Sequence, residues 1–267
     1  NFRAGVNAGN SIASGGNYNV VVGDEAGTAI TTGDQNVAIG YEALKTEDTG
    51  SRNTAVGAYT LNVLNNDALS YNTAIGYASG LSVTTGTNNT LIGGLAGDAI
   101  TTGGDNVSIG FSSLSSTTTA TNNSAVGTYA LNVNTTGGSN VAMGYNALGA
   151  NTTASNNTAI GTSALTLNTT GTGNTAVGQG AGAAVTTGTN NTIVGKLAGD
   201  AITTGDANVA IGEDALSSTT TADSNVAIGQ GAMEANTTGA SNVAIGAAAL
   251  DANTTAANNT AVGYSSL

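Results

Sequence analysis

The chain has 267 residues, of which 40 are Gly, and it contains no Pro, Cys, His or Trp. Sixteen acids against four bases give a formal net charge of −12. Without His or Cys the chain lacks the usual general bases, thiols and soft metal ligands, so the composition argues against an enzyme and predicts no catalytic residue, cofactor or metal site. The acidic charge argues against nucleic acid as a partner. Because no apolar run approaches the ~20 residues of a membrane helix, we expect no membrane insertion by this segment.

A five-residue phrase, Asn-x-x-x-Gly, recurs sixteen times and first occurs as Asn1 to Gly5. From Gly76 onward every interval between its glycines is 17 residues. The later glycines of the phrase are Gly23, Gly40, Gly57, Gly76, Gly93, Gly110, Gly127, Gly144, Gly161, Gly178, Gly195, Gly212, Gly229, Gly246 and Gly263. The asparagines four residues before them are Asn19, Asn36, Asn53, Asn72, Asn89, Asn106, Asn123, Asn140, Asn157, Asn174, Asn191, Asn208, Asn225, Asn242 and Asn259. A short fixed period is typical of a solenoid, so we expect one continuous repeat domain over residues 1–267, as a segment of a longer fibre.

The residues between each Asn and Gly are mostly β-branched or Ala, which favours strands over helices. The sequence therefore predicts an all-β fold, a parallel β-solenoid (β-roll) of about sixteen 17-residue coils. Because side chains alternate along a strand, we place the residues after Asn and before Gly, such as Val37 and Ile39, toward the interior. The residue between them, such as Ala38, is then expected to face outward. Each glycine is expected at a corner, where a Cβ would obstruct the turn or the neighbouring coil.

The asparagine column has two interpretations. Each amide can bond to the next coil or to the corner backbone, which would make a structural ladder along the solenoid. Alternatively, Asn only favours the turn that precedes the strand. We favour the ladder, because every one of the sixteen positions holds Asn, with no Asp or Gly.

The core residues show an exchange between two positions. Coils with Gly at the fourth place after the corner carry Ile or Val three residues later, whereas coils with Leu or Met there mostly carry Asn or Thr. The first kind comprises Gly9/Ile12, Gly27/Ile30, Gly80/Val83, Gly97/Ile100, Gly182/Val185 and Gly199/Ile202. The second comprises Leu114/Thr117, Leu131/Asn134, Leu148/Asn151, Leu165/Asn168, Met233/Asn236 and Leu250/Asn253. Leu61/Leu64 and Leu44/Glu47 depart from the rule. The pattern predicts that one large apolar side chain per coil fills one core slot from either of two backbone positions.

The residue placed outward is never charged from Asn19 onward. It is Ala in most coils, Ser108 in one, and Val21, Leu91 or Ile193 in others. A strand that is apolar on both faces is usually covered on both. We therefore expect self-association along the solenoid, as a homotrimer; a bare wall of alanines is the alternative.

Several phrases resemble known repeats. Asn36–Gly40, Asn123–Gly127 and Asn225–Gly229 resemble the head repeats of YadA-like trimeric autotransporter adhesins, and Gly144-Tyr-Asn-Ala-Leu148 is similar to repeats of bacteriophage tail-fibre and bacterial surface-fibre proteins. The resemblance covers essentially the whole chain. It implies a left-handed β-roll in which three chains associate. It also implies an extracellular fibre shaft or adhesin, on a virion or bacterial cell surface, that holds or presents a receptor-binding tip.

Other functions remain as alternatives. The Thr-Thr pairs at the far turn suggest an ice-binding solenoid, although adjacent residues leave only one outward rank of Thr. The aromatics that follow the corner, Tyr41, Tyr77, Phe111 and Tyr145, suggest a fibre that binds a cell-surface receptor or glycan by stacking on sugars. Sparse acids at Asp98, Asp105, Asp200 and Asp206 suggest a cation between coils, and the paired acids Asp24-Glu25 and Glu213-Asp214 suggest a polysaccharide-cutting site.

Overall fold

The computed structural model describes residues 1–67 and 69–267, and within them the chain forms sixteen three-residue strands and no helix. Each strand occupies the three residues between the Asn and the Gly of the repeated phrase. The strands are β1 (Phe2–Ala4), β2 (Val20–Val22), β3 (Val37–Ile39), β4 (Thr54–Val56), β5 (Thr73–Ile75), β6 (Thr90–Ile92), β7 (Val107–Ile109), β8 (Ser124–Val126), β9 (Val141–Met143), β10 (Thr158–Ile160), β11 (Thr175–Val177), β12 (Thr192–Val194), β13 (Val209–Ile211), β14 (Val226–Ile228), β15 (Val243–Ile245) and β16 (Thr260–Val262).

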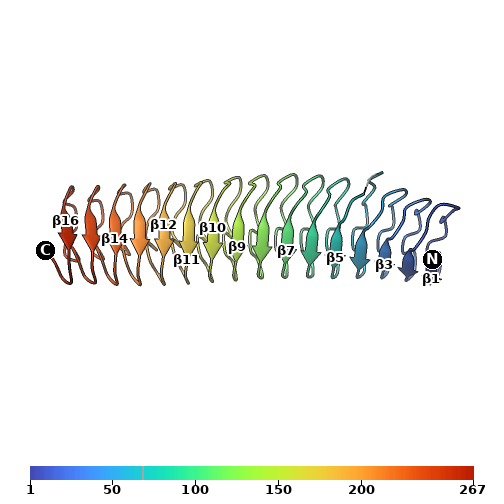
Figure 1. Cartoon of the computed structure of the whole chain (residues 1–267), viewed down its shortest axis with the longest axis horizontal. Helices are drawn as coiled ribbons and strands as arrows, with labels where there is room; N and C mark the ends of the chain where they lie inside the picture. Colours follow the sequence, from blue (N-terminus) through green and yellow to red (C-terminus); the bar gives the residue numbers. More distant parts are fainter. Residues whose placement is uncertain (68) are drawn as a thin grey trace. The chain divides into compact units, whose positions relative to one another are not determined.

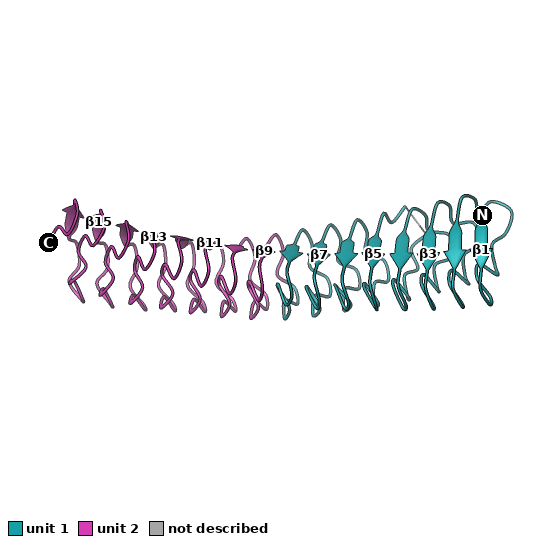
Figure 2. Cartoon of the chain, turned by 90° about the horizontal axis from the view of Figure 1, so that it is seen from below, with its two compact units in different colours: residues 1–136 teal, residues 137–267 magenta. Residues whose placement is uncertain are grey.

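The chain divides into two compact units, Asn1–Thr136 with β1–β8 and Gly137–Leu267 with β9–β16 (Figure 2). Within each unit the strands pair in parallel and in chain order, each with the next coil's equivalent strand (Figure 1). The register aligns equivalent residues, so Ala159 lies opposite Ala176. The interval of 19 residues between Gly57 and Gly76 keeps this register, since Thr54 pairs with Thr73. The predicted parallel β-solenoid is therefore confirmed. The left-handed winding of the coils and the single continuous domain stay predictions.

The predicted facing of the strands is wrong. The middle residue of each strand from β2 to β15, such as Ala38 or Ala159, is fully buried, whereas its two neighbours are partly exposed. The reason lies in the asparagine before the strand. Asn36 is itself fully buried, and alternation with period two then places the residue two positions later, Ala38, on the same inner side.

The inward facing explains why the middle residue is occasionally large. Val21, Leu91 and Ile193 stand in coils that carry Gly at the fourth place after the corner. A Cβ added to Gly97 would lie 2.8 Å from both the Ile100 Cδ1 and the Leu91 Cδ2, so the space above the glycine is filled from two sides. The exchange of the large apolar side chain between two core positions is confirmed. The middle residue of the strand is a third position from which a large side chain can fill the core.

Backbone conformation accounts for the choice between Gly and Leu at the fourth place after the corner. The position is left-handed in both kinds of coil, with φ of 51° at Leu148 and 58° at Gly182. Glycine adopts this region freely, whereas for another residue it costs roughly 1–2 kcal/mol. Leu148 is fully buried, and burial of a Leu side chain contributes about 1.5–3 kcal/mol, which offsets that cost.

A pair of alanine variants on one strand tests the facing. Ile193→Ala should destabilise the protein by about 2–5 kcal/mol, because Ile193 is fully buried and the surrounding coil cannot close the cavity. Val194→Ala, its partly exposed neighbour, should cost about 1 kcal/mol or less. Urea unfolding followed by circular dichroism measures both. Equal losses, or a larger loss for Val194→Ala, would contradict the inward placement of the middle residue.

Candidate functional site

The asparagine column is a hydrogen-bonded ladder inside each unit. The Asn157 N–H donates to the Asn140 Oδ1 (3.0 Å), and the Asn157 Oδ1 accepts from the Asn174 N–H (2.9 Å). The Asn157 Nδ2 donates to the Gly171 carbonyl (2.8 Å). From Asn36 to Asn242 every member of the column is fully buried. The side chain therefore satisfies a main-chain donor and a main-chain acceptor of the next coil, because the Asn amide carries its acceptor and its donor on two separate atoms.

The corner glycines are required for two separate reasons. Gly161 has φ of 135°, in the range that side chains other than glycine's rarely adopt. A Cβ added there would lie 2.4 Å from the carbonyl oxygen of Gly178, the corner of the next coil. The next coil's backbone therefore lies directly against each corner.

Substitutions at Asn157 test the ladder. Asn157→Ala should cost about 2–5 kcal/mol, because it leaves the Asn174 N–H and the Gly171 carbonyl buried without partners, at about 1–3 kcal/mol each. Asn157→Asp keeps the acceptor but places a carboxyl group in a buried site, which raises its folded pKa. This variant should therefore lose stability as pH rises and approach wild type in acid, as urea unfolding at pH 4 and pH 8 would reveal. Wild-type stability in both variants would show that Asn acts only through turn preference.

The outward strand faces form two uncharged ranks. The residue after each Asn is Val, Thr or Ser from β2 onward, and the residue before each Gly is Val, Ile or Met. Apolar members of the second rank remain substantially exposed, with 39% of Ile75, 43% of Met143 and 40% of Ile245 open to solvent. Each unit thus carries an uncharged, largely β-branched surface along its sheet, apolar in the rank before the glycines and mixed with Thr in the other.

The corner aromatics gather into edge-to-face contacts within unit 1. The ring centroids of Tyr41 and Tyr59 lie 5.3 Å apart, and those of Tyr59 and Tyr77 lie 6.0 Å apart. Phe111 and Tyr129 make a similar contact at 5.8 Å. Of the four aromatics expected from the sequence, Tyr41, Tyr77 and Phe111 lie in unit 1, whereas Tyr145 lies in unit 2 and is 54% exposed. The sequence analysis missed Tyr59 and Tyr129, which stand one position later in their coils.

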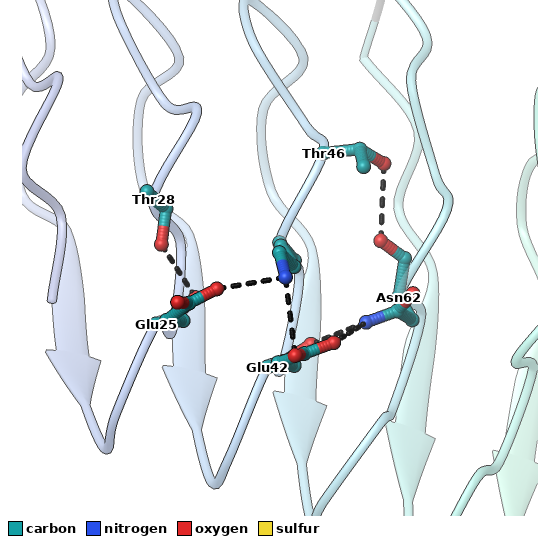
Figure 3. Close-up of polar contacts among 6 residues, drawn as sticks. Glu25, Thr28, Glu42, Thr46 and Asn62 are labelled. Atoms are coloured by element: carbon teal, nitrogen blue, oxygen red, sulfur yellow. Dashed lines mark hydrogen bonds and ion pairs between the residues drawn. The ribbon is translucent and has the colours of Figure 1, made fainter. Parts of the chain in front are cut away.

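A polar network lies on the same corner as these rings. Lys45 forms ion pairs with Glu25 (2.7 Å) and Glu42 (3.1 Å). The Asn62 Nδ2 donates to the Glu42 carbonyl (3.0 Å), and the Thr46 Oγ1 donates to the Asn62 carbonyl (3.0 Å), as Figure 3 shows. The hydrogen bond from Lys45 lowers the pKa of Glu42, and the two carboxylates raise the pKa of Lys45. Glu42 and Lys45 are therefore both charged at neutral pH.

Two of the acids that the sequence pairs form ion pairs with lysine. Glu213 pairs with Lys196 at 3.0 Å, and Glu25 pairs with Lys45. Asp98 and Asp200 each have a buried Oδ1 that lacks a hydrogen-bond partner, and burial raises the pKa of both. In the described part of the chain no group of three or more acidic residues is placed to hold a metal ion.

The Thr-Thr pairs present one exposed rank. The Thr169 Oγ1 donates to the Thr186 carbonyl (3.1 Å), and the Thr186 Oγ1 repeats this contact to Thr203 (3.1 Å). The second member of each pair, such as Thr170 or Thr187, is exposed. The hydroxyl of the first Thr thus bonds to the main chain of the next coil. The single outward rank of Thr expected from the sequence is confirmed.

Glu47 is a buried carboxylate where other coils have Asn or Thr. Its Oε1 accepts from the backbone N–H groups of Gly50 (2.9 Å) and Asp48 (3.1 Å), and its Oε2 is buried without a partner. Burial raises the pKa of Glu47 to about 7, and the charge of Asp67 acts in the same direction. The carboxyl group is neutral in acid in both the folded and the unfolded chain. As pH rises from about 4.5 toward 7, the unfolded state ionises first, so stability falls.

The variant Glu47→Gln tests this linkage. Gln keeps the acceptor for Gly50 and Asp48 but cannot ionise, so it should remove most of the fall in stability between pH 5 and pH 8. At pH 8 the variant should be more stable than wild type by on the order of 2 kcal/mol, with little difference at pH 4. Thermal unfolding across this range is the measurement. A constant difference at every pH would mean that Glu47 does not titrate with a raised pKa.

In the described residues, no helix has both the length and the apolar character that a membrane span needs. A comparison with protein-family models gives no match, and a comparison with curated proteins gives none either. Two surfaces therefore remain as candidate binding sites, namely the outward strand faces and the corner aromatics of unit 1.

Proposed function

We propose that the chain is a structural fibre shaft or adhesin that works outside the cell, on a virion or a bacterial surface, as a homotrimer without catalysis. The observation that carries the proposal is the pair of uncharged ranks on the outward strand faces. None of the charged residues of the chain lies in β2–β16. A sheet face that stays in water usually carries charged side chains among its polar ones, whereas these strands carry Thr and Ser but no charge.

The corrected facing strengthens the argument for self-association. The middle residue is covered by the chain's own interior, so the surface that needs a cover is made of Val, Ile and Thr rather than of Ala. Parallel sheets are normally covered on both faces, and exposed apolar patches mark interaction sites. A second copy presents the same spacing from strand to strand, so that its side chains match this surface over its whole length. The resemblance to trimeric adhesin heads supports three copies.

The construction of the coils suits a shaft that resists mechanical force along its length. Each coil contacts only its neighbours, so stability is approximately a sum over coils and their interfaces, and length can change by whole coils. Neutral hydrogen bonds of the asparagine ladder join successive coils inside each unit. Such bonds are buried and uncharged, so salt screens them little.

Light scattering tests the assembly. The wild-type protein should have three times the 25.5 kDa mass of one chain. The variant Ile211→Lys/Ile228→Lys places two charges on the outward faces of β13 and β14 and should shift the mass to that of one chain, with unchanged circular dichroism. Thr221→Lys/Thr238→Lys, at exposed far-turn positions of the same unit, should remain trimeric.

A wild-type mass of 25.5 kDa, or a trimer that withstands Ile211→Lys/Ile228→Lys, would refute assembly through the strand faces. Electron microscopy adds a second readout. Slender particles of uniform width are expected, and compact globules would argue against a fibre.

A further inference from the structure

The aromatic side chains at the corners of unit 1 form a surface that the trimer does not require. We define the corner strip as Tyr41, Tyr59, Tyr77, Phe111 and Tyr129. The Tyr59 N–H donates to the Tyr41 carbonyl (2.9 Å), and the Tyr129 N–H donates to the Phe111 carbonyl (3.1 Å). These bonds set the second residue after one corner beside the first residue after the preceding corner, so that rings from alternating positions meet edge to face.

The coil between Tyr77 and Phe111 does not interrupt the strip with a bulky polar group. Its first residue after the corner is Gly94, and a Cβ there would lie 3.5 Å from the Phe111 Cδ2. The ring of Phe111 therefore packs against this glycine. Leu95, which follows, is only partly exposed. The strip thus runs over the corners of consecutive coils from Tyr41 to Tyr129.

The rings are not needed to cover the corner. Tyr41 is 43% exposed, Tyr77 60% and Phe111 47%, so much of each ring faces solvent. In unit 2 the equivalent first position is aromatic in two coils, at Tyr145 and Tyr264, and holds Thr162, Gln179, Lys196, Glu213, Gln230 or Ala247 in the other six. The corner geometry is the same in coils without a ring, with φ of 140° at Gly195 and 133° at Gly212. The coil forms equally well without an aromatic ring, so the concentration of rings in unit 1 requires another explanation.

Fixed polar groups border the strip at its Tyr41 end. The Glu42 carboxylate raises the pKa of the neighbouring Tyr41 hydroxyl and is itself held by Lys45 and Asn62. Glu42 and Asn62 lie on adjacent coils and point toward each other (Figure 3). Carboxylate, amide and ammonium groups thus stand beside exposed rings, in an arrangement where their contacts already restrict their rotamers.

We propose that the corner strip of unit 1 binds a carbohydrate chain made of neutral or amino sugars, which lies along the strip with its ring faces on the aromatic side chains. The C–H groups on a sugar face are weakly positive and complement the negative face of an aromatic ring. The hydroxyl groups of the sugar can then bond to Glu42, Asn62 and Lys45. The inference rests on the proposed adhesive function and names its ligand class.

Charge separates this ligand from the other molecules that stack on aromatic rings. Single-stranded nucleic acids need a positively charged groove beside the stacking rings. Here Glu25 and Glu42 outnumber Lys45, and the whole chain has a net charge of −12. Anionic polysaccharides are disfavoured for the same reason, whereas an amino sugar gains from the carboxylates. Contacts of this kind are weak singly, and their repetition over several coils raises the avidity.

Affinity electrophoresis in native gels tests the proposal. The gels would contain hydroxyethylcellulose, dextran, glycol chitosan or polygalacturonate, and a separate lane would contain an oligo-dT single strand. We expect retardation by at least one neutral or amino polymer, with Kd raised at least tenfold in Tyr41→Ala/Tyr77→Ala. The matched control Tyr264→Ala removes an exposed aromatic at the same place after the corner in unit 2 and should bind like wild type. The chain has no Trp and eight Tyr, four of which lie in the strip, so a change in Tyr fluorescence that is lost in Tyr41→Ala/Tyr77→Ala gives a second readout of binding.

Retardation by none of the neutral or amino polymers would overturn the proposal, and so would wild-type binding by Tyr41→Ala/Tyr77→Ala. Stronger retention by polygalacturonate or by the oligo-dT strand would equally overturn the assignment to neutral or amino sugars. Circular dichroism and light scattering on the same samples verify that each variant folds and assembles. A trimer that binds no sugar refutes the corner strip alone, whereas sugar binding by a single chain refutes the trimeric fibre alone.

Discussion

The buried asparagine that precedes each strand is the contact on which the other features depend. Its side chain joins two successive coils by accepting from one main-chain N–H and donating to one main-chain carbonyl, as in Asn157. For this the amide must lie inside the coil, and the alternation of the strand then decides every other orientation. The residue two positions later points inward. It must be small, or the coil must carry Gly at the fourth place after the corner to make room for it. The residues on either side of it point outward.

The narrow interior follows from the same geometry. With Ala at most middle positions, the remaining volume is filled by one side chain at a left-handed position, by one three residues later, or by a larger middle residue. Gly199 illustrates how the three sources balance, because a Cβ there would meet Ile202 at 2.9 Å and Ile193 at 3.4 Å. Leu at the left-handed position is strained, and the strain is tolerated because the side chain is wholly buried. Volume rather than residue type is therefore what the coil conserves along its length.

The sequence was sufficient for the fold because its period is explicit. The spacing of Asn and Gly located each strand, and the exchange of Gly/Ile for Leu/Asn located the core slot. The facing of the strands could not be obtained from alternation alone, since both sides are uncharged and a three-residue strand offers no longer pattern. The few large residues at the middle position of the strand could have indicated its inward facing, because Leu91 and Ile193 occur in coils where Gly97 and Gly199 leave space.

The sequence located only part of the corner strip, because its pattern does not show which positions of neighbouring coils lie side by side. Tyr59 and Tyr129 stand at the second position after the corner, and only the hydrogen bonds between coils bring that position beside the first position of the preceding coil. The buried charge of Glu47 was visible as a departure from Asn or Thr, but its cost depends on an Oε2 without a partner.

Some positions of the coil hold the same kind of residue throughout the chain, and others differ from coil to coil. The asparagine column, the corner glycines and the uncharged faces of the strands recur in both units, so they belong to the construction of the coil itself. The first position after the corner is not uniform in this way. It holds Tyr41, Tyr77 and Phe111 among the coils of unit 1, and in unit 2 it holds Lys196, Glu213 and Gln230 as well as Tyr145 and Tyr264. Duplication of coils copies the scaffold unchanged and leaves these corners free to differ. The corner strip proposed as a binding surface therefore lies at positions where the fold allows one coil to differ from the next without disturbing the core.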